Sequence, residues 1–352
     1  MGMRVLVFAN RVQNAKLSVR ESHIHKHLQG NGVKIIYIYN FYYKSLSFEM
    51  LVNYLKLFYC FLTKKKDDLI LIANDRSVSF LSFFKKIGFK LAIDIIDNRA
   101  LQRLAYKVDD SPEKIAFLQK LLLKNIDICD YIFPVSQSCK ELYPEKYHSK
   151  IFVIENAADP LWLKYSKLPE ELSIGFVSGI APGRGIEFLI KAGEIIKGKV
   201  PEIKLYIAGT ASKESEEYYA KLKCRYESSW ISFFDDISYS VNINQFISKC
   251  YLMVIPSPDH IYFRTTLHLK LFDSLACGRP VVSTNCKETA RILNTYHCGL
   301  VSDFTEQDFA GKITQLLMNR DEASIMGKNG RRIVEDIYNW DNMARKIIHC
   351  TC

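Results

Sequence analysis

The chain has 352 residues, of which 48% are hydrophobic and 24% are charged, the composition of a globular protein long enough for two domains of ordinary size. It contains no run of about 18 apolar residues, so we expect no transmembrane helix. The net charge of +10 favours a phosphorylated or otherwise anionic partner, or an acidic membrane surface.

The N-terminal residues 1–10 carry one charge and a short apolar run, which predicts a first strand rather than a signal peptide. We therefore expect a cytoplasmic protein, at most peripheral to the inner face of the membrane. Lysines and arginines are spread along the chain without aromatic platforms, so no nucleic-acid partner is expected. The ten cysteines show no metal-ligand spacing, and we predict reduced thiols and no metal site.

The chain opens with a β-α-β pattern, the unit from which parallel sheets are built. Residues 3–8 and 35–39 are apolar runs typical of buried strands, and residues 21–29 between them have helical character and end at Gly30. The loop of residues 9–18 would lie at the carboxyl end of the first strand, where open α/β sheets bind ligands. It lacks a G-x-G-x-x-G sequence, so no dinucleotide fingerprint is present there.

Residues 46–63 are rich in Leu, Phe and Tyr and are followed by three lysines at 64–66. The first interpretation is a helix that faces the core and has a solvated basic end. The second is an aromatic and basic surface that touches anionic lipid.

Further short apolar runs predict strands at residues 69–73, 90–96 and 131–135. Asp94 and Asp97 flank the carboxyl end of the second of these, and Asn98 and Arg99 come next. Polar residues at a strand exit are candidates for a site, although Asp97 could equally cap a following helix. The charged segment 164–171, which contains Pro169, is the predicted boundary between domains.

A second β-α-β series begins at Ser173, with a predicted strand at 174–177, a loop at 178–185 and a helix at 186–196. The loop sequence SGIAPGRG places Arg184 beside the helix N-terminus. Backbone N–H groups, the helix dipole and a guanidinium together suit a phosphate, whereas glycines at such a join also serve tight packing. Strands are predicted next at 204–208, 231–234, 251–255 and 280–283, with a mainly helical C-terminal part. Two such series predict two Rossmann-like domains facing each other, with the site in the cleft between them.

Residues 268–284, HLKLFDSLACGRPVVST, predict a buried helix, a turn and a strand. Thr266, Lys270 and Asp273 fall on one face of that helix, so a cation and a carboxylate lie on a buried element. Unpaired buried charges cost several kcal/mol, so each needs a partner. Either Lys270 and Asp273 pair within the helix, or they form a polar wall that faces a ligand.

Several segments resemble the motifs of glycosyltransferase family 4, the retaining enzymes of the GT-B fold that transfer sugar from a nucleotide-sugar. They are VIENAADP, FVSGIAPGRGIEFLIKA, CYLMVIPSP, KLFDSLACGRPVVST and YNWDNMARKI. The likeness is specific from residue 173 to 347 and rests on pattern alone in the N-terminal half. It implies an acceptor-side domain at 1–165 that is completed by a C-terminal helix at about 339–352, and a donor-binding domain at 170–338.

The resemblance also implies roles for single residues. Arg184 takes the position of a loop Lys that binds donor phosphate, Asp273 that of the second Glu of an E-x7-E motif, which binds the ribose, and Lys270 that of a Lys in one subgroup. The first Glu falls at Thr265 and a companion Arg at Gly179, so both of those charges are missing. The implied donor-binding residues are Gly183, Arg184, Gly185, Gly209, Thr265, Thr266, Lys270 and Asp273.

The implied reaction is transfer from a UDP- or GDP-sugar, with retention, to a glycan or a lipid-linked acceptor. Because the chain has no D-x-D motif, we expect no metal, and the donor is a substrate rather than a cofactor. Asp97 is the candidate catalytic base, with Asn98 and Arg99 on the acceptor side, and an anionic membrane surface is a further expected partner. The alternative is a non-catalytic GT-B relative that binds a nucleotide or glycan, a hypothesis motivated by the missing Glu and Arg.

Overall fold

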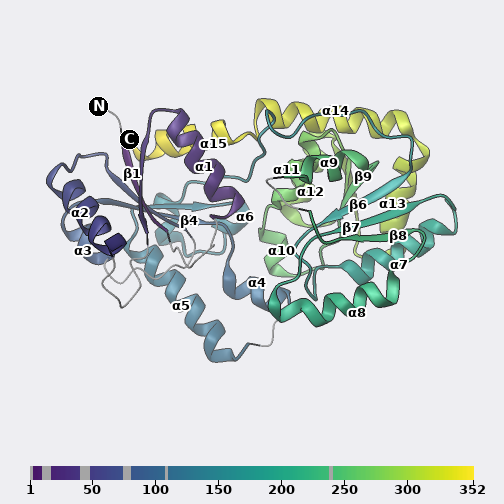
Figure 1. Cartoon of the computed structure of the whole chain (residues 1–352), viewed down its shortest axis with the longest axis horizontal. Helices are drawn as coiled ribbons and strands as arrows, with labels where there is room; N and C mark the ends of the chain where they lie inside the picture. The colour runs from purple at the N-terminus through teal and green to yellow at the C-terminus, as the bar shows by residue number, and fades with distance from the viewer. Residues whose placement is uncertain (1–2, 10–16, 40–47, 74–80, 108–109, 238–240) are drawn as a thin grey trace. The chain divides into compact units, whose positions relative to one another are not determined.

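The computed structural model describes residues 3–9, 17–39, 48–73, 81–107, 110–237 and 241–352. The chain divides into two compact units, each built on a parallel sheet (Figure 1). Unit 1 comprises Met1–Ala100, Pro112–Glu155 and Trp340–Cys352, and unit 2 comprises Leu101–Ser111 and Asn156–Asn339. The predicted fold class, two parallel-sheet α/β domains, is confirmed.

Unit 1 has a five-stranded sheet in the order β2-β1-β3-β4-β5, with every described pairing parallel. Its strands are near-continuous apolar runs because both faces of a parallel sheet are covered. They span Arg4–Ala9 (β1), Lys34–Tyr39 (β2), Leu69–Ala73 (β3), Lys90–Ile95 (β4) and Tyr131–Pro134 (β5). The predicted loop after β1 lies outside the described residues from 10 to 16.

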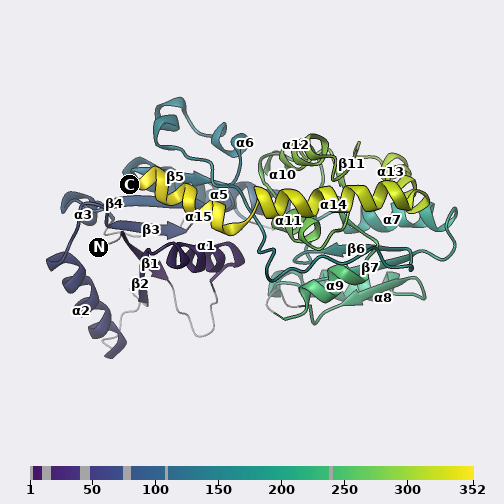
Figure 2. The same cartoon turned by 90° about the horizontal axis from the view of Figure 1, so that it is seen from above.

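Helix α1 of unit 1 begins with a capping box. The Glu21 N–H donates to Ser18 Oγ at 3.2 Å, and the Ser18 N–H donates to the Glu21 carboxylate at 3.0 Å. Helix α15 lies beside α1, with the buried Trp340 ring stacked 5.4 Å from that of His23, and Figures 1 and 2 show the two helices together. The helices of this unit are α1 (Val19–Gly30), α2 (Phe48–Leu62), α3 (Leu81–Lys86), α5 (Pro112–Ile128), α6 (Gln137–Lys140), the short 3₁₀ helix η1 (Glu145–Lys150) and α15 (Trp340–Thr351).

Unit 2 has a six-stranded sheet in the order β11-β10-β9-β6-β7-β8, again parallel in every described pairing. The first strand, β6, pairs with both β7 and β9, so the strand order reverses there. Open α/β sheets bind their ligands at this switch point. The strands span Ser173–Val177 (β6), Lys204–Ala208 (β7), Ile231–Phe234 (β8), Leu252–Ile255 (β9), Val281–Thr284 (β10) and Gly299–Ser302 (β11).

Helices cover both faces of the unit 2 sheet, with α11 and α14 above it and α7 and α8 below it in Figure 1. Helix α7 packs against α13, and α14 packs closely on α11 because Gly330 leaves room for Leu275. The helices are α7 (Ile186–Lys197), η2 (Lys213–Ser215), α8 (Glu216–Tyr226), α9 (Ile243–Lys249), α10 (Ile261–Thr265), α11 (Leu269–Ala276), α12 (Lys287–Tyr296), α13 (Glu306–Met318) and α14 (Arg320–Asp336).

The predicted strands are present with bounds that differ by at most one residue at either end, and β11 was not predicted. The domain boundary differs more, because the chain enters unit 2 at Asn156 rather than between residues 165 and 170. The reason is polar bonding: Asn156 donates to the Leu267 carbonyl at 2.6 Å, and Arg331 donates to the carbonyls of Pro160 and Leu163 at 2.9 and 2.7 Å. These bonds tie the segment to unit 2.

Helix α4, Arg99–Ala105, begins in unit 1, but its residues from Leu101 onward belong to unit 2. Gln102 donates to the Tyr262 hydroxyl at 3.1 Å, and the Tyr106 ring meets that of Tyr262 edge-on at 5.6 Å. Ala105 joins the small apolar cluster around these rings. A stretch of the N-terminal sequence therefore completes the second unit, which no local pattern predicts.

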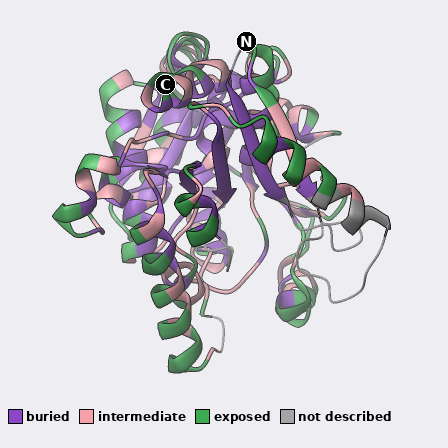
Figure 3. Cartoon of the chain, turned by 90° about the vertical axis from the view of Figure 1, so that its left-hand side faces the viewer, coloured by how far each residue is buried: buried purple, intermediate pink, exposed green. Residues whose placement is uncertain are grey.

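The prediction that residues 46–63 form a core-facing helix is wrong in its second half. Helix α2 is present, but of its described side chains only Cys60 is buried, and Figure 3 shows the described part of the helix largely exposed. The apolar residues left in solvent are Leu55, Phe58, Tyr59, Phe61 and Leu62. None of the helices that the structure describes has the length and hydropathy needed to span a bilayer.

Candidate anion-binding site

The loop between β6 and α7 is held by glycines whose backbone no other residue could adopt at this packing. Gly183 and Gly185 have φ of +76° and +79°. A Cβ at Gly183 would stand 2.2 Å from the Ala105 carbonyl oxygen, and one at Gly185 would stand 1.8 Å from that of Pro256. Gly209, at the end of β7, has φ of +149° and approaches the Ser178 carbonyl oxygen in the same way. These glycines therefore serve tight packing, which fixes the residue between the first two.

That residue is Arg184, whose guanidinium is held by neutral groups. Its Nη1 donates to Ser178 Oγ at 2.7 Å, and its Cζ lies 4.0 Å from the centre of the Tyr106 ring. Its Nε is buried and has no hydrogen-bond partner in the described chain. Among the described residues, no carboxylate forms an ion pair with it. A buried donor without an acceptor is costly, and an anionic ligand would supply the acceptor.

A second cation, Lys270, lies in the first turn of α11 and is half-buried. Its Nζ stands 4.6 Å from the centre of the Phe176 ring and makes no hydrogen bond within the described residues. Burial lowers the pKa of Lys270 well below its ordinary value, and the positive charge of Arg184 lowers it further. The two cations repel each other at a place where an anion would relieve the repulsion.

His268 lies beside these cations and is held by neutral partners. Its Nε2 and Nδ1 are hydrogen-bonded with the hydroxyls of Ser257 and Thr289, at 3.1 and 3.3 Å, and its ring stacks on Phe263. Burial lowers the pKa of His268 well below its ordinary value, and the charges of Lys270 and Arg184 lower it further. The surroundings of His268 therefore favour the neutral imidazole.

The N-terminus of α7 adds a favourable dipole to this site. The helix begins after Gly185, which has no side chain with which to cap the N–H groups of the first turn. Burial raises the pKa of Tyr218, and Glu187 in that turn raises it further. An N-terminus of this kind next to two cations can bind phosphate groups.

Three further residues of unit 2 were predicted to bind the nucleotide-sugar donor: Thr265, Thr266 and Asp273. Thr265 is buried at the end of α10, and its hydroxyl donates to the Ile261 carbonyl at 2.9 Å. Thr266 follows it and is half-buried. Asp273 is buried, and its charge adds to the burial that raises the pKa of Cys277 to about 12. The Asp273 carboxylate lies close enough to Cys277 to raise its pKa, whereas the Lys270 ammonium lies over the Phe176 ring. The two charges of the predicted stripe therefore have different neighbours.

In unit 1, the predicted polar cluster at the end of β4 consists of Asp94, which is ion-paired, and the three residues Asp97, Asn98 and Arg99. Asp94 is buried and paired with Arg20 at 2.8 Å, and Arg20 also donates to the Ile154 carbonyl at 2.8 Å. Asp97 and Asn98 are half-buried residues that precede α4, and Arg99, its first residue, is exposed. The catalytic role of Asp97 and the acceptor-side roles of its neighbours stay predictions.

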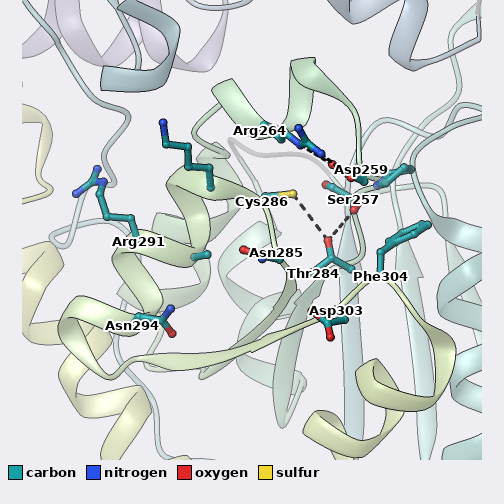
Figure 4. A pocket seen from close by; sticks show the side chains of 13 residues that line it. Ser257, Asp259, Arg264, Thr284, Asn285, Cys286, Arg291, Asn294, Asp303 and Phe304 are labelled. Atoms are coloured by element: carbon teal, nitrogen blue, oxygen red, sulfur yellow. Dashed lines mark hydrogen bonds and ion pairs between the residues drawn. The ribbon is translucent and has the colours of Figure 1, made fainter. Parts of the chain in front are cut away.

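A separate polar cavity of about 610 Å³ opens in unit 2 at the carboxyl ends of β9, β10 and β11. Figure 4 shows Thr284 at its centre, bonded to the Ser257 carbonyl at 2.6 Å, with the Arg264–Asp259 pair at one rim and Asn294 across from it. Ser257 links this cavity to His268 and so to the cations. The amide, carboxylate and guanidinium groups that line the cavity can form hydrogen bonds with a ligand rich in hydroxyls.

Tyr106, Ser178, Phe176 and His268 were not predicted to take part in this site. The sequence carried a weak signal only for Ser178, the first residue of the glycine loop. Tyr106 comes from the N-terminal half of the chain, and its contact with Arg184 depends on the tertiary structure.

A known protein family matches the part of the chain that carries this site. Residues 171–319 match the family model described as glycosyl transferases group 1. No curated protein matches the chain.

Solved structures match over nearly the whole chain. Sucrose-phosphate synthase from Thermosynechococcus elongatus has a TM-score of 0.74 at 16% identity, covering 99% of this chain and 98% of that one. HepE from Anabaena in complex with UDP has a TM-score of 0.71 at 15% identity, covering 99% of both chains. A glycosyltransferase from Rickettsia africae has a TM-score of 0.68 at 17% identity, covering 99% and 97%. At these identities the likeness shows the fold, which is GT-B.

Proposed function

We propose that the chain is a glycosyltransferase that uses a nucleotide-diphosphate sugar, and that Arg184 and Lys270 bind the diphosphate. The observation that carries the proposal is a pair of cations, Arg184 before α7 and Lys270 in α11, that form no ion pair with any described carboxylate and lie near the switch point of the unit 2 sheet. The family model over residues 171–319 supports it, as does the UDP held by a structural neighbour.

In the proposed reaction, the bond between the anomeric carbon and the diphosphate oxygen breaks as an acceptor hydroxyl forms the new glycosidic bond. Negative charge then grows on the leaving diphosphate. Arg184, Lys270 and the α7 N-terminus lie ready to stabilise that charge, so no metal is required. The transfer retains the anomeric configuration, and Asp97 accepts the proton of the acceptor hydroxyl, with Asn98 and Arg99 contacting the acceptor.

Asp273, Thr265 and Thr266 are assigned to the nucleoside and sugar of the donor, which is a UDP- or GDP-sugar. Gly183, Gly185 and Gly209 bring the backbone close to it. The acceptor is a glycan or a lipid-linked sugar, and the enzyme works in the cytoplasm, at most peripheral to the membrane. The family resemblance of residues 173–347 supports these finer assignments.

Titration calorimetry with UDP and GDP tests the diphosphate site. We expect one nucleotide to bind and Arg184→Ala to weaken it about tenfold to a hundredfold, since a charge-assisted hydrogen bond contributes about 1.5–3 kcal/mol. Lys191→Ala is the matched control, because Lys191 is an exposed cation later in the same helix. Absence of binding at millimolar nucleotide, or equal binding by Arg184→Ala, would refute the proposal.

A non-catalytic relative that binds a nucleotide or glycan is the second candidate. Thr265 favours it, because a hydroxyl committed to the Ile261 carbonyl stands where the family has a carboxylate. Slow hydrolysis of a nucleotide-sugar by the wild type, lost in Asp273→Asn, would exclude this candidate. Binding of the nucleotide without turnover of any donor sugar, with or without acceptors, would favour it.

A further inference from the structure

Helix α2 of unit 1 carries its apolar residues on the solvent side. Leu55, Phe58, Tyr59 and Leu62 are 59%, 60%, 55% and 65% exposed and follow the spacing of a single helical face. Phe61 adds a further ring that is 48% exposed. Single exposed apolar residues are common, whereas a continuous stripe on one helix indicates a surface that binds something.

The charge around this stripe has one sign. From residue 50 to residue 66 the sequence holds four lysines and no carboxylate. Lys64 and Lys66 are exposed at the end of the helix. The acidic groups that follow the lysines are already neutralised, since Asp68 pairs with the buried Arg4 and Asp67 lies 3.4 Å from Lys90, and Glu49 precedes the stripe in the first turn of α2. At its C-terminal end the apolar stripe is therefore bordered by a basic rim.

The end of α3 extends the same surface. Lys64 donates to the Ile87 carbonyl at 2.8 Å, which fixes the end of α2 against the residue that follows α3. Phe83 of α3 is 58% exposed, and Lys86 is exposed beside it. Figures 1 and 2 show α2 and α3 next to each other in both views. We call the exposed residues of α2 and α3 the α2–α3 face.

We propose that the α2–α3 face docks on an anionic phospholipid bilayer. Its Leu and Phe side chains would enter the boundary between headgroups and acyl chains, Tyr59 would lie at the headgroup level, and the lysines would meet lipid phosphates. Charge complementarity selects this partner, because an apolar stripe that ends in exposed lysines matches a negative lipid surface. The inference deepens the peripheral membrane association of the proposed function by naming the surface and the lipid charge, and vesicle binding by this face needs no sugar transfer.

Flotation with vesicles tests it, using phosphatidylcholine alone and phosphatidylcholine mixed with phosphatidylglycerol. We expect the full chain to float only with the anionic vesicles and to be released by high salt. Phe58→Ser with Leu62→Ser should weaken binding at least about tenfold. Lys64→Glu with Lys66→Glu should weaken it at least as much, since each lysine near the surface contributes about a factor of five.

Phe117→Ser is the control, because Phe117 of α5 is 62% exposed in the same unit but lies outside the α2–α3 face. Circular dichroism checks that each variant is folded, and all the substituted residues are exposed. The proposal is overturned if the wild type binds neither vesicle, or if the α2 variants float as the wild type does. It is also overturned if size-exclusion chromatography shows a dimer that Phe58→Ser dissociates, since the face would then join two copies of this chain.

Discussion

The two units hold cations in opposite ways. In unit 1, Arg20 is paired with Asp94, and Arg4 is paired with Asp68. In unit 2, Arg184 and Lys270 are held by a hydroxyl and aromatic rings, and the charge of Arg184 lowers the pKa of Lys270. A buried charge with a partner is part of the scaffold, whereas desolvated cations that repel each other indicate a site made for an anion.

The largest expected effect is in unit 1. Replacing Arg20 with Met leaves the buried Asp94 carboxylate unpaired, and we expect a loss of about 3–5 kcal/mol in the free energy of unfolding. Urea denaturation measures it, with Lys86→Met as an exposed control on α3. The double variant Arg20→Met, Asp94→Leu should recover most of the loss. If Arg20→Met alone had only a small effect, the Arg20–Asp94 pair would not stabilise unit 1, and the contrast with the cations of unit 2 would be lost.

Lys270→Met should act in the opposite direction. The substitution removes a desolvated cation and leaves a flexible apolar chain on the Phe176 ring, so we expect unfolding to cost about 1 kcal/mol more than in the wild type. Nucleotide diphosphate binding should weaken in the same variant. Thermal unfolding and calorimetry measure the two quantities. Destabilisation by Lys270→Met would show that its charge has a stabilising partner and would weaken the case for an anion site.

The smallest expected effect is the uptake of a fraction of a proton when a nucleotide diphosphate binds. The pKa of Lys270 in the free protein is lowered from 10.5, and a bound diphosphate would raise it again because opposite charge favours the ammonium. Between the lowered pKa and 10.5, binding should therefore be accompanied by proton uptake, and affinity should fall as pH rises through this window. Calorimetry at pH above about 8, where the nucleotide is fully ionised, in buffers of different ionisation enthalpy measures the uptake.

Lys270→Met supplies the control for that measurement, since it lacks the titrating group. Uptake of the same size in wild type and variant would assign the proton to another group. No uptake in either would indicate that Lys270 does not contact the diphosphate.

Much of the candidate site could be predicted from short stretches of sequence. The glycine loop around Arg184 and the helix that carries Lys270 both follow from local patterns, and the structure brings these two residues together. The loop needed its glycines because Ala105 and Pro256 approach so closely, a contact that only the fold creates. Asp94 looked like a site residue because it ends a strand, but Arg20, 74 residues away in the sequence, neutralises it.

The sequence by itself determined every described strand except β11, several of the helices and the positions of the candidate cations, because the periodicity of apolar residues and the chemistry of turns act over a few neighbours. Only the tertiary structure decided which charges are paired, that Leu101–Ser111 completes unit 2, and that α2 turns its apolar face to solvent. The physical reason is that burial and charge pairing depend on contacts between distant residues. A local pattern can show that a helix is amphipathic, but not what covers it.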